Sequence, residues 1–185
     1  MTVLDWIFTA IAGVWIFEFV LFRNRGTGEE DPVEKRSFLV ILAALSGTIA
    51  TAYIVGEMKA FEQAMPWLKA IGILFFAGGV FLRYWGILHL KAQFTRHVTV
   101  RKGDGIVSTG PYRKLRHPLY TGLLLIAIGM ALFFQSIAVA VIGGALVGWA
   151  LARRMDSEEA MLIGEFGEEY QEWMKRRARL IPFIY

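Results

Sequence analysis

The sequence predicts an all-α integral membrane protein with five transmembrane helices, the last two forming a helical hairpin, followed by cytoplasmic C-terminal helices. Three observations favour this class. Hydrophobic residues make up 56% of the 185 residues and the mean hydropathy is +0.47, whereas apolar content in soluble domains is about 45–50%. The apolar residues gather into long runs, and the basic residues collect in alternate gaps between those runs.

Five apolar runs approach the roughly 20 residues that a helix needs to cross a bilayer core. They are residues 3–22, 38–55, 67–90, 119–134 and 137–152. Only Gln135 and Ser136 separate the last two runs, so we expect an antiparallel hairpin whose halves are a little short for a full crossing. No basic residue precedes the first run, and it exceeds the roughly 7–15 residues of a signal-peptide core. We therefore interpret it as a retained span.

The positions of lysine and arginine predict the orientation, because cytoplasmic loops collect basic residues. The first loop, the stretch between the third and fourth runs, and the C-terminal region together hold 17 of the 20 basic residues. Five spans with the N-terminus outside place all of these on the cytoplasmic side of the cell inner or cytoplasmic membrane. The net charge of +4 then reflects orientation and contact with anionic membrane lipids, not a nucleic-acid partner.

Several familiar catalytic centres are excluded by composition. The chain has no cysteine, which rules out disulfides, thiolate metal sites and cysteine nucleophiles. Its three histidines, His89, His97 and His117, are too few for a histidine-rich metal cage, so no metal is expected. The GxGxxG phosphate-binding pattern is also absent, and the glycines within the apolar runs are expected to allow close helix packing.

The region after the fifth run has helical periodicity. Its apolar positions, with spacings of 7, 4, 4 and 3, fall on one stripe. They are Met155, Leu162, Phe166, Tyr170 and Trp173. We expect Asp156 or Ser157 to cap a new helix, Gly167 to break it and Pro182 to end it. The stripe and the adjacent basic residues 175–179 fit a helix that lies on, or folds back against, the membrane surface.

Two sets of polar residues at the membrane edge are candidates for chemistry. Arg154 and Glu158 are four residues apart and share a face if the helix of the fifth run continues. An ordinary ion pair is the alternative, although charges at the edge of an apolar bundle usually face a cavity. His117 precedes Pro118, which restricts its backbone where the chain enters the membrane. The alternative for His117 is a loop or capping residue.

Glu18 and Arg83 each lie a few residues before the cytoplasmic end of their span, at similar depth. We expect the two side chains to pair or to line the same polar pocket. The alternative is that each snorkels to the interface.

A two-part motif resembles a known family. The segment VSTGPYRKLRHPLYTG at residues 107–122 is followed by the apolar hairpin and then by R-x-x-x-EE-x-x-L-x-x-x-FG-x-x-Y and R-L-I-P. This pattern resembles the isoprenylcysteine carboxyl methyltransferase family, which belongs with the membrane phospholipid methyltransferases. It covers about the last 80 residues, whereas the first three spans match only in hydropathy.

The resemblance implies an S-adenosylmethionine-dependent membrane methyltransferase without a Rossmann domain. From the apolar runs alone, residues 1–90 are expected to form three spans with a polar loop at 23–37. Residues 91–185 would form the catalytic part: a cofactor loop at 91–118, the hairpin at 119–152 and helices at 153–185. By the same resemblance, Arg154 and Glu158 are the catalytic residues. The residues implied in cofactor binding are Val107, Gly110, Tyr112, Arg116, His117, Pro118, Tyr120 and Glu159. Asp104 stands where many relatives have histidine, which leaves a cofactor contact there without support.

These residue types suit methyl transfer to a lipidic acceptor. A sulfonium cofactor is already activated, so the protein mainly aligns the acceptor with the methyl group and excludes water. The expected acceptor is the carboxylate of an isoprenylcysteine-like lipid, held by Arg154. Glu158 would orient Arg154 or bind the cofactor amino group. The alternatives are a phosphatidylethanolamine-type N-methyltransferase, in which Glu158 takes a proton, a sterol-reductase-like protein using a nicotinamide cofactor, or a non-catalytic membrane relative.

Overall fold

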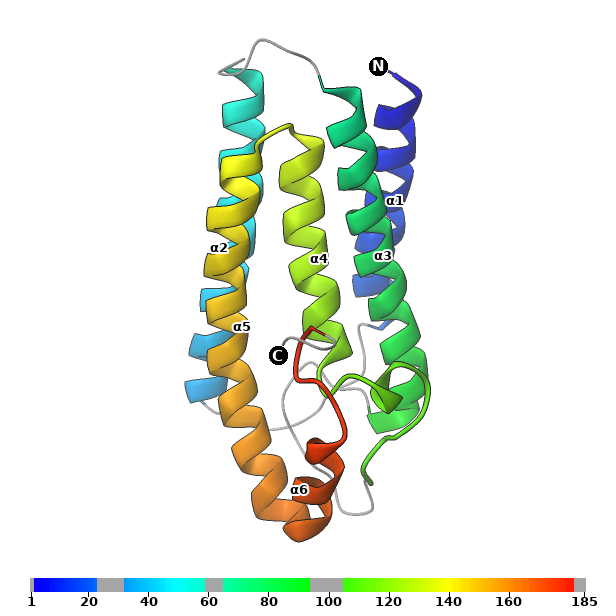
Figure 1. Ribbon diagram of the computed structural model, residues 1–185, viewed down its shortest axis with the longest axis vertical. Helices are drawn as coiled ribbons and strands as arrows, with labels where there is room; N and C mark the ends of the chain where they lie inside the picture. Colours follow the sequence, from blue (N-terminus) through cyan, green and yellow to red (C-terminus); the bar gives the residue numbers. More distant parts are fainter. Residues whose placement is uncertain (1, 23–31, 59–64, 94–104, 182–185) are drawn as a thin grey trace.

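The computed structural model describes residues 2–22, 32–58, 65–93 and 105–181, and these are mainly helical, with turns, irregular connecting segments and one isolated bridge between the helices (Figure 1). All five apolar runs form helices, as predicted. The elements are α1 (Val3–Leu21), α2 (Pro32–Glu57), α3 (Pro66–Leu90), the short 3₁₀ helices η1 (Lys91–Gln93) and η2 (Gly110–Arg113), α4 (Pro118–Phe133), α5 (Ile137–Phe166) and α6 (Glu168–Lys175).

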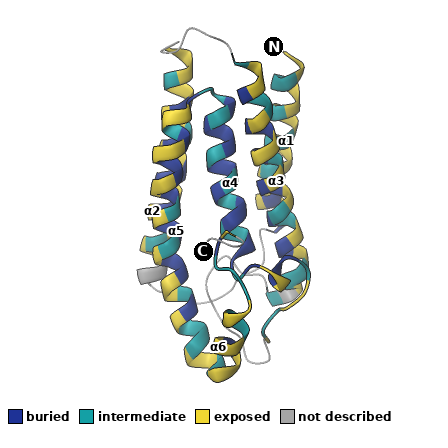
Figure 2. Ribbon diagram, in the orientation of Figure 1, coloured by how far each residue is buried: buried dark blue, intermediate teal, exposed yellow. Residues whose placement is uncertain are grey.

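Among the described residues, four helices are long and apolar enough to cross a membrane: α1, residues Lys35–Glu57 of α2, α3 and α5. The 16-residue helix α4 is shorter and lies in the middle of the bundle, where most of its surface is covered by protein (Figure 2). It packs against α2, α3 and α5, and it runs in the opposite direction to α5 after the short connection predicted from the sequence. The all-helical class is confirmed, whereas five complete crossings stay a prediction.

The helix ends follow local chemistry. Thr2 and Asp5 form a reciprocal capping box at the start of α1, and the Ser136 side chain accepts a hydrogen bond from the Val139 N–H at the start of α5. Proline occupies the first turn of α3 and of α4, where its missing N–H costs nothing. These signals set the helix starts independently of the packing.

Glycines allow α3 and α4 to approach closely, as expected from their place in the apolar runs. A methyl group added at Gly79 of α3 would lie 2.6 Å from the carbonyl oxygen of Gly122 in α4. One added at Gly72 would lie 2.7 Å from the carbonyl oxygen of Gly129. Backbone therefore meets backbone at two levels, which is how small residues stabilise helix pairs in membranes.

The Gly79→Ala substitution is expected to lower the free energy of unfolding by about 1–3 kcal/mol, because the new methyl group forces α3 and α4 apart. Gly78→Ala on the same helix is the matched control, since an added methyl group at Gly78 meets no atom within 4 Å. Unfolding in mixed micelles would measure both. Equal stability of the two variants would contradict the close-packing explanation.

Helix α5 corrects the prediction for the C-terminal region. Asp156 and Ser157 cap no new helix, because both lie inside one continuous helix of 30 residues. Residues 150–160 contain good helix formers and no glycine or proline, so the turn-by-turn hydrogen bonding continues, and the Ser157 hydroxyl donates back to the Arg153 carbonyl. The expected single stripe is therefore divided between α5 and α6.

The predicted break at Gly167 is confirmed. Gly167 has a φ of +58°, a left-handed conformation that favours glycine, and it ends α5 and begins α6. Pro182 lies outside the described residues, and α6 already ends at Lys175. The turn at Gly167 lets the chain fold back beneath the bundle (Figure 1).

Candidate functional site

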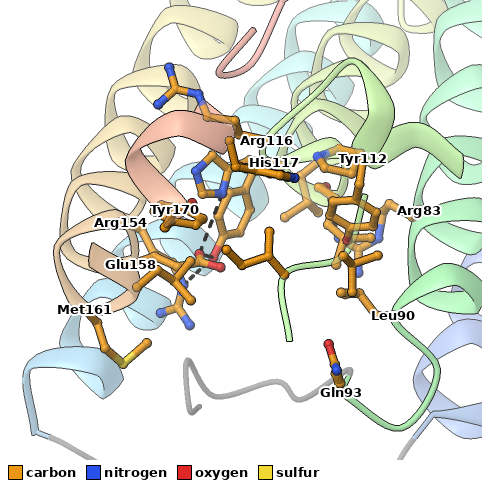
Figure 3. A pocket seen from close by; sticks show the side chains of 18 of the residues that line it. Arg83, Leu90, Gln93, Tyr112, Arg116, His117, Arg154, Glu158, Met161 and Tyr170 are labelled. Atoms are coloured by element: carbon orange, nitrogen blue, oxygen red, sulfur yellow. Dashed lines mark hydrogen bonds and ion pairs between the residues drawn. The ribbon is translucent and has the colours of Figure 1, made fainter. Parts of the chain in front are cut away.

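One cavity of about 390 Å³ lies at the end of the bundle where α4 begins and α6 folds back (Figure 3). Its wall takes residues from α1, α2, α3, α4, α5 and α6 and from the segment at residues 105–112. The polar and tyrosine side chains in the wall include Glu18, Arg83, Tyr112, Arg116, His117, Tyr120, Arg154, Glu158 and Tyr170. The apolar side chains include Phe19, Phe22, Phe38, Ile41, Leu119 and Leu123.

Arg154 and Glu158 share a face of α5, as the spacing predicts, and Tyr120 of α4 links them. The Nε of Arg154 donates to the Tyr120 hydroxyl at 2.9 Å, and that hydroxyl donates to the Glu158 carboxylate at 2.8 Å. A nitrogen of the Arg154 guanidinium also donates to the Ser37 hydroxyl of α2 at 2.8 Å. The guanidinium is thus buried and held from two neighbouring helices at the cavity wall.

His117 and Glu159 form the next layer. His117 is 5% exposed and occupies the position before the first turn of α4, where the following Pro118 restricts its backbone. Its Nε2 lies 2.9 Å from an oxygen of Glu159, and its ring stacks on that of Tyr120 with centroids 5.6 Å apart. Arg116 donates to the same Glu159 oxygen at 2.8 Å. His117 therefore precedes the first turn of α4, and its ring is also oriented by contacts with Glu159 and Tyr120.

The C-terminal segment at residues 178–180 supports this layer through its backbone. The Arg116 N–H donates to the Ala178 carbonyl at 2.8 Å, and the Ala178 N–H donates to the Lys114 carbonyl at 3.0 Å. The Thr121 hydroxyl donates to the Leu180 carbonyl at 2.6 Å. This pairing brings together residues more than 50 positions apart and turns the Arg179 side chain inward.

The segment before the RHP motif closes another side of the cavity. Gly110 has a φ of +57° and packs directly against the His89 ring, so no side chain fits at this position. Trp173 of α6 donates to the Ser108 hydroxyl at 2.8 Å. Burial, together with the negative charge of Glu158, raises the pKa of Tyr112, so the Tyr112 hydroxyl stays protonated and can donate a hydrogen bond.

Glu18 and Arg83 pair, as expected from their depth. The Nε of Arg83 donates to one Glu18 oxygen at 2.8 Å, and a second guanidinium nitrogen contacts the other oxygen. Glu18 is 3% exposed and Arg83 is 9% exposed, so snorkelling to the interface is wrong for both. The two side chains also line the cavity, where Arg83 lies on the side away from Arg154 (Figure 3).

The cavity brings together most of the residues singled out by the sequence motif. Those in its wall are Val107, Tyr112, Arg116, His117, Pro118, Tyr120, Arg154 and Glu158. Gly110 and Glu159 lie outside the wall, which does not support a direct cofactor contact for either residue: Gly110 packs on His89, and the Glu159 carboxylate is turned toward His117 and Arg179. Asp104 lies outside the described residues.

Sequence reasoning missed several contributors. Ser37 carries no motif, and its role depends on α2 lying beside α5. Arg177 and Arg179 belong to the basic residues 175–179 interpreted as a surface feature, yet both are partly buried and bind protein groups. Arg177 donates to the Tyr112 carbonyl at 2.8 Å and lies over the Trp173 ring. In the sequence, only the position of these two arginines shortly after the helical stripe pointed to a contact with the site.

Comparison with known proteins assigns the family. The model of the isoprenylcysteine carboxyl methyltransferase (ICMT) family matches residues 70–164. The chain belongs to this family. The match includes the RHP motif, α4 and the glutamate pair of α5, so most of the polar cavity wall lies within the ICMT-family segment.

Individual relatives agree. Protein-S-isoprenylcysteine O-methyltransferase of Xenopus laevis is 32% identical over 146 residues, which cover 77% of this chain and 50% of that protein. The Homo sapiens protein of the same name is 34% identical over 125 residues, covering 66% of this chain and 44% of that one. The chain thus spans about half the length of the vertebrate relatives it matches.

A solved structure supports the fold. The structure of a eukaryotic intramembrane Ras methyltransferase, ICMT, without a monobody superposes with a TM-score of 0.73 at 22% identity. The superposition covers 96% of this chain and 67% of that one. Together with the four long apolar helices, this likeness identifies an integral membrane protein of the ICMT family. In the described part of the chain, no group of three or more acidic or histidine side chains is arranged to hold a metal ion.

Proposed function

We propose that this ICMT-family protein is an S-adenosylmethionine-dependent methyltransferase that esterifies the carboxylate of an isoprenylcysteine-like lipid. The observation that carries the proposal is the Arg154–Tyr120–Glu158 arrangement in a cavity whose wall holds both polar and apolar side chains. Such a cavity suits two ligands of different character, a polar cofactor and a lipidic acceptor.

The residues present fit S-adenosylmethionine. Glu158 offers a carboxylate in the wall for the cofactor's ammonium group, and the rings of His117, Tyr170 and Trp173 offer flat surfaces for its adenine. Tyr112 offers a buried hydroxyl donor. When bound, the cofactor supplies an activated methyl group on a positively charged sulfur. The residues proposed to surround it are Val107, Tyr112, Arg116, His117, Pro118, Tyr120 and Glu158.

Arg154 is proposed to hold the acceptor carboxylate. A carboxyl group of this kind is ionised at neutral pH, so it needs a cation to position it and no general base. Arginine stays charged and can bind a carboxylate through two parallel hydrogen bonds. Tyr120 and Ser37 restrain the Arg154 guanidinium, which favours one orientation of the bound acceptor. Catalysis then comes from aligning the acceptor carboxylate with the methyl group and from excluding water.

The apolar part of the cavity is proposed to take the isoprenoid chain from the side of the bundle. Phe19 and Phe22 belong to α1, whereas Phe38 and Ile41 belong to α2. Helix α1 packs mainly on α3, and most of its surface is exposed in the structure, as expected for a lipid-facing helix (Figure 2). We therefore place the acceptor entry between α1 and α2.

The proposed arrangement in the membrane has five crossings, an outside N-terminus and the cavity on the cytoplasmic side. Arg116 and Arg154 line the cavity, and Lys175 ends α6, which also contributes to the cavity wall; the positive-inside tendency therefore favours a cytoplasmic position for this end of the bundle. Helix α4 crosses with the help of its protein neighbours, since a helix of 16 residues covers about 24 Å.

Purified protein in nanodiscs, supplied with methyl-labelled S-adenosylmethionine, tests the activity. N-acetyl-S-farnesylcysteine is expected to gain a label that mild base releases as methanol, whereas its preformed methyl ester, with the carboxylate blocked, should gain none. Base-stable label in phosphatidylethanolamine would contradict the carboxylate assignment. Binding of NADPH in place of S-adenosylmethionine would contradict methyl transfer altogether.

A further inference from the structure

The two adjacent glutamates of α5 have different surroundings. Glu158 lines the cavity, and its side chain is 24% exposed. The Glu159 side chain is 9% exposed and lies behind the RHP motif, outside the cavity wall. A role in ligand contact for Glu158 therefore does not extend to Glu159.

The Glu159 carboxylate makes three polar contacts with two segments. One oxygen faces His117 Nε2 at 2.9 Å and Arg116 at 2.8 Å. The other faces Arg179 of the C-terminal segment at 3.1 Å. Arg116 and Arg179 already place two positive charges beside this carboxylate, so a neutral histidine ring that donates one N–H is enough to complete its contacts.

The contact with Glu159 selects one form of His117. A neutral imidazole carries its proton on one nitrogen, and the hydrogen bond made by that nitrogen decides which. Because an ionised carboxylate can only accept, Nε2 carries the proton and Nδ1 presents a lone pair. His117 Nδ1 lies 3.9 Å from an oxygen of Glu158. Two acceptors then face one another in the cavity wall.

We propose that Glu159 is a positioning residue: through its hydrogen bond to Nε2–H it holds His117 with Nδ1 as an acceptor beside Glu158. This pair of acceptors suits a ligand group that carries several N–H donors, such as an ammonium. The assignment rests on the proposed function for the identity of that group, the α-ammonium of S-adenosylmethionine. Glu159 itself touches no ligand.

The C-terminal segment at residues 178–180 also helps to hold Glu159 and His117 in place. Its backbone pairs with residues 114–117, and its Arg179 side chain binds Glu159. A change at Glu159 therefore loosens Arg116, His117 and Arg179 together, at the point where the RHP motif enters α4. Asp156 also binds Arg179, but its side chain is 62% exposed and forms no hydrogen bond or ion pair with His117 in the described part of the chain, which makes it a suitable control.

Nitrogen-15 NMR of the histidine rings in the 185-residue protein without cofactor tests the tautomer directly, with His117→Asn used to assign the signal among the three histidines. Wild-type His117 is expected to be neutral with the proton on Nε2. Glu159→Gln should give a mixture of tautomers and weaken S-adenosylhomocysteine binding by about 10-fold or more, the effect typical of losing a charged hydrogen-bond partner. Asp156→Asn should leave both readouts unchanged.

Three outcomes would overturn the assignment: a doubly protonated or Nδ1-protonated His117 in the wild type, an unchanged tautomer in Glu159→Gln, or a Kd for S-adenosylhomocysteine within twofold of wild type in that variant. If Glu159→Gln does not fold, Glu159→Asp replaces it; the retained charge should keep the tautomer while the shorter side chain weakens binding. Failure of the wild type to bind S-adenosylhomocysteine would contradict the proposed function, whereas the tautomer measured without cofactor tests Glu159 alone.

Discussion

Replacing Arg154 with alanine is expected to reduce methyl transfer by at least about 100-fold, because the acceptor carboxylate loses the group proposed to align it with the methyl donor. Arg154→Lys should also fail, since a lysine ammonium cannot reproduce the two-pronged contact or the hydrogen bonds to Tyr120 and Ser37. The measurement is the initial rate of farnesylcysteine methylation in nanodiscs, with binding of S-adenosylhomocysteine as a check that the cavity persists.

The adjacent arginine provides a matched control for this prediction. Arg153 is exposed and lies over the Trp149 ring, away from the cavity wall. Arg153→Ala removes the same charge from the same helix and should leave turnover within about twofold of wild type, as expected for a surface substitution. Near-normal turnover in Arg154→Ala, or equal losses in the two variants, would show that Arg154 does not position the acceptor.

Breaking the Glu18–Arg83 pair is expected to produce the largest loss of stability. Arg83→Gln leaves a buried carboxylate without its cation, and Glu18→Gln leaves a buried guanidinium without its anion. Each change should lower the free energy of unfolding by about 3–5 kcal/mol. The double substitution Glu18→Gln/Arg83→Gln should cost less than the sum of the two, because no uncompensated charge remains. Unfolding measurements on the four proteins give the coupling free energy.

A second ion pair between the same helices serves as the comparison. Lys69 of α3 donates to Asp5 of α1 at 3.0 Å, near the opposite end of the pair of helices, and these side chains are 25% and 23% exposed. Partly solvated pairs contribute about 0–1 kcal/mol, so Lys69→Gln, which leaves the capping box of Thr2 and Asp5 in place, should have a small effect. If Glu18→Gln destabilises no more than Lys69→Gln, burial is not what makes the inner pair important.

Much of the fold follows from local sequence features. The five apolar runs are long enough to predict helices without tertiary information. Capping residues such as Thr2 and Ser136 lie at helix starts. The region around Asp156 was misjudged because a capping residue can also lie within a helix. Its local preference for a cap is small compared with the continuous hydrogen bonding of α5 and the burial of Met155 in the core.

The candidate site was predictable in part. Arg154, Glu158, His117 and Tyr120 belong to a motif with fixed spacing, so their residue numbers could be chosen from the chain alone, and the depth of Glu18 in its span pointed to Arg83. The contacts of Ser37 and Arg179 carry no comparable signal. Both depend on segments distant in sequence coming together, which a one-dimensional pattern does not record.

The sequence by itself determined the all-helical class, the family motif and the apolar runs, because each depends on composition or on spacing along one segment. Only the tertiary structure decided which glutamate of the pair faces the cavity. Glu158 and Glu159 are chemically identical neighbours, but a helix turns by about 100° per residue. One carboxylate therefore reaches Tyr120 in the cavity wall, and the other meets His117 and Arg179 behind it.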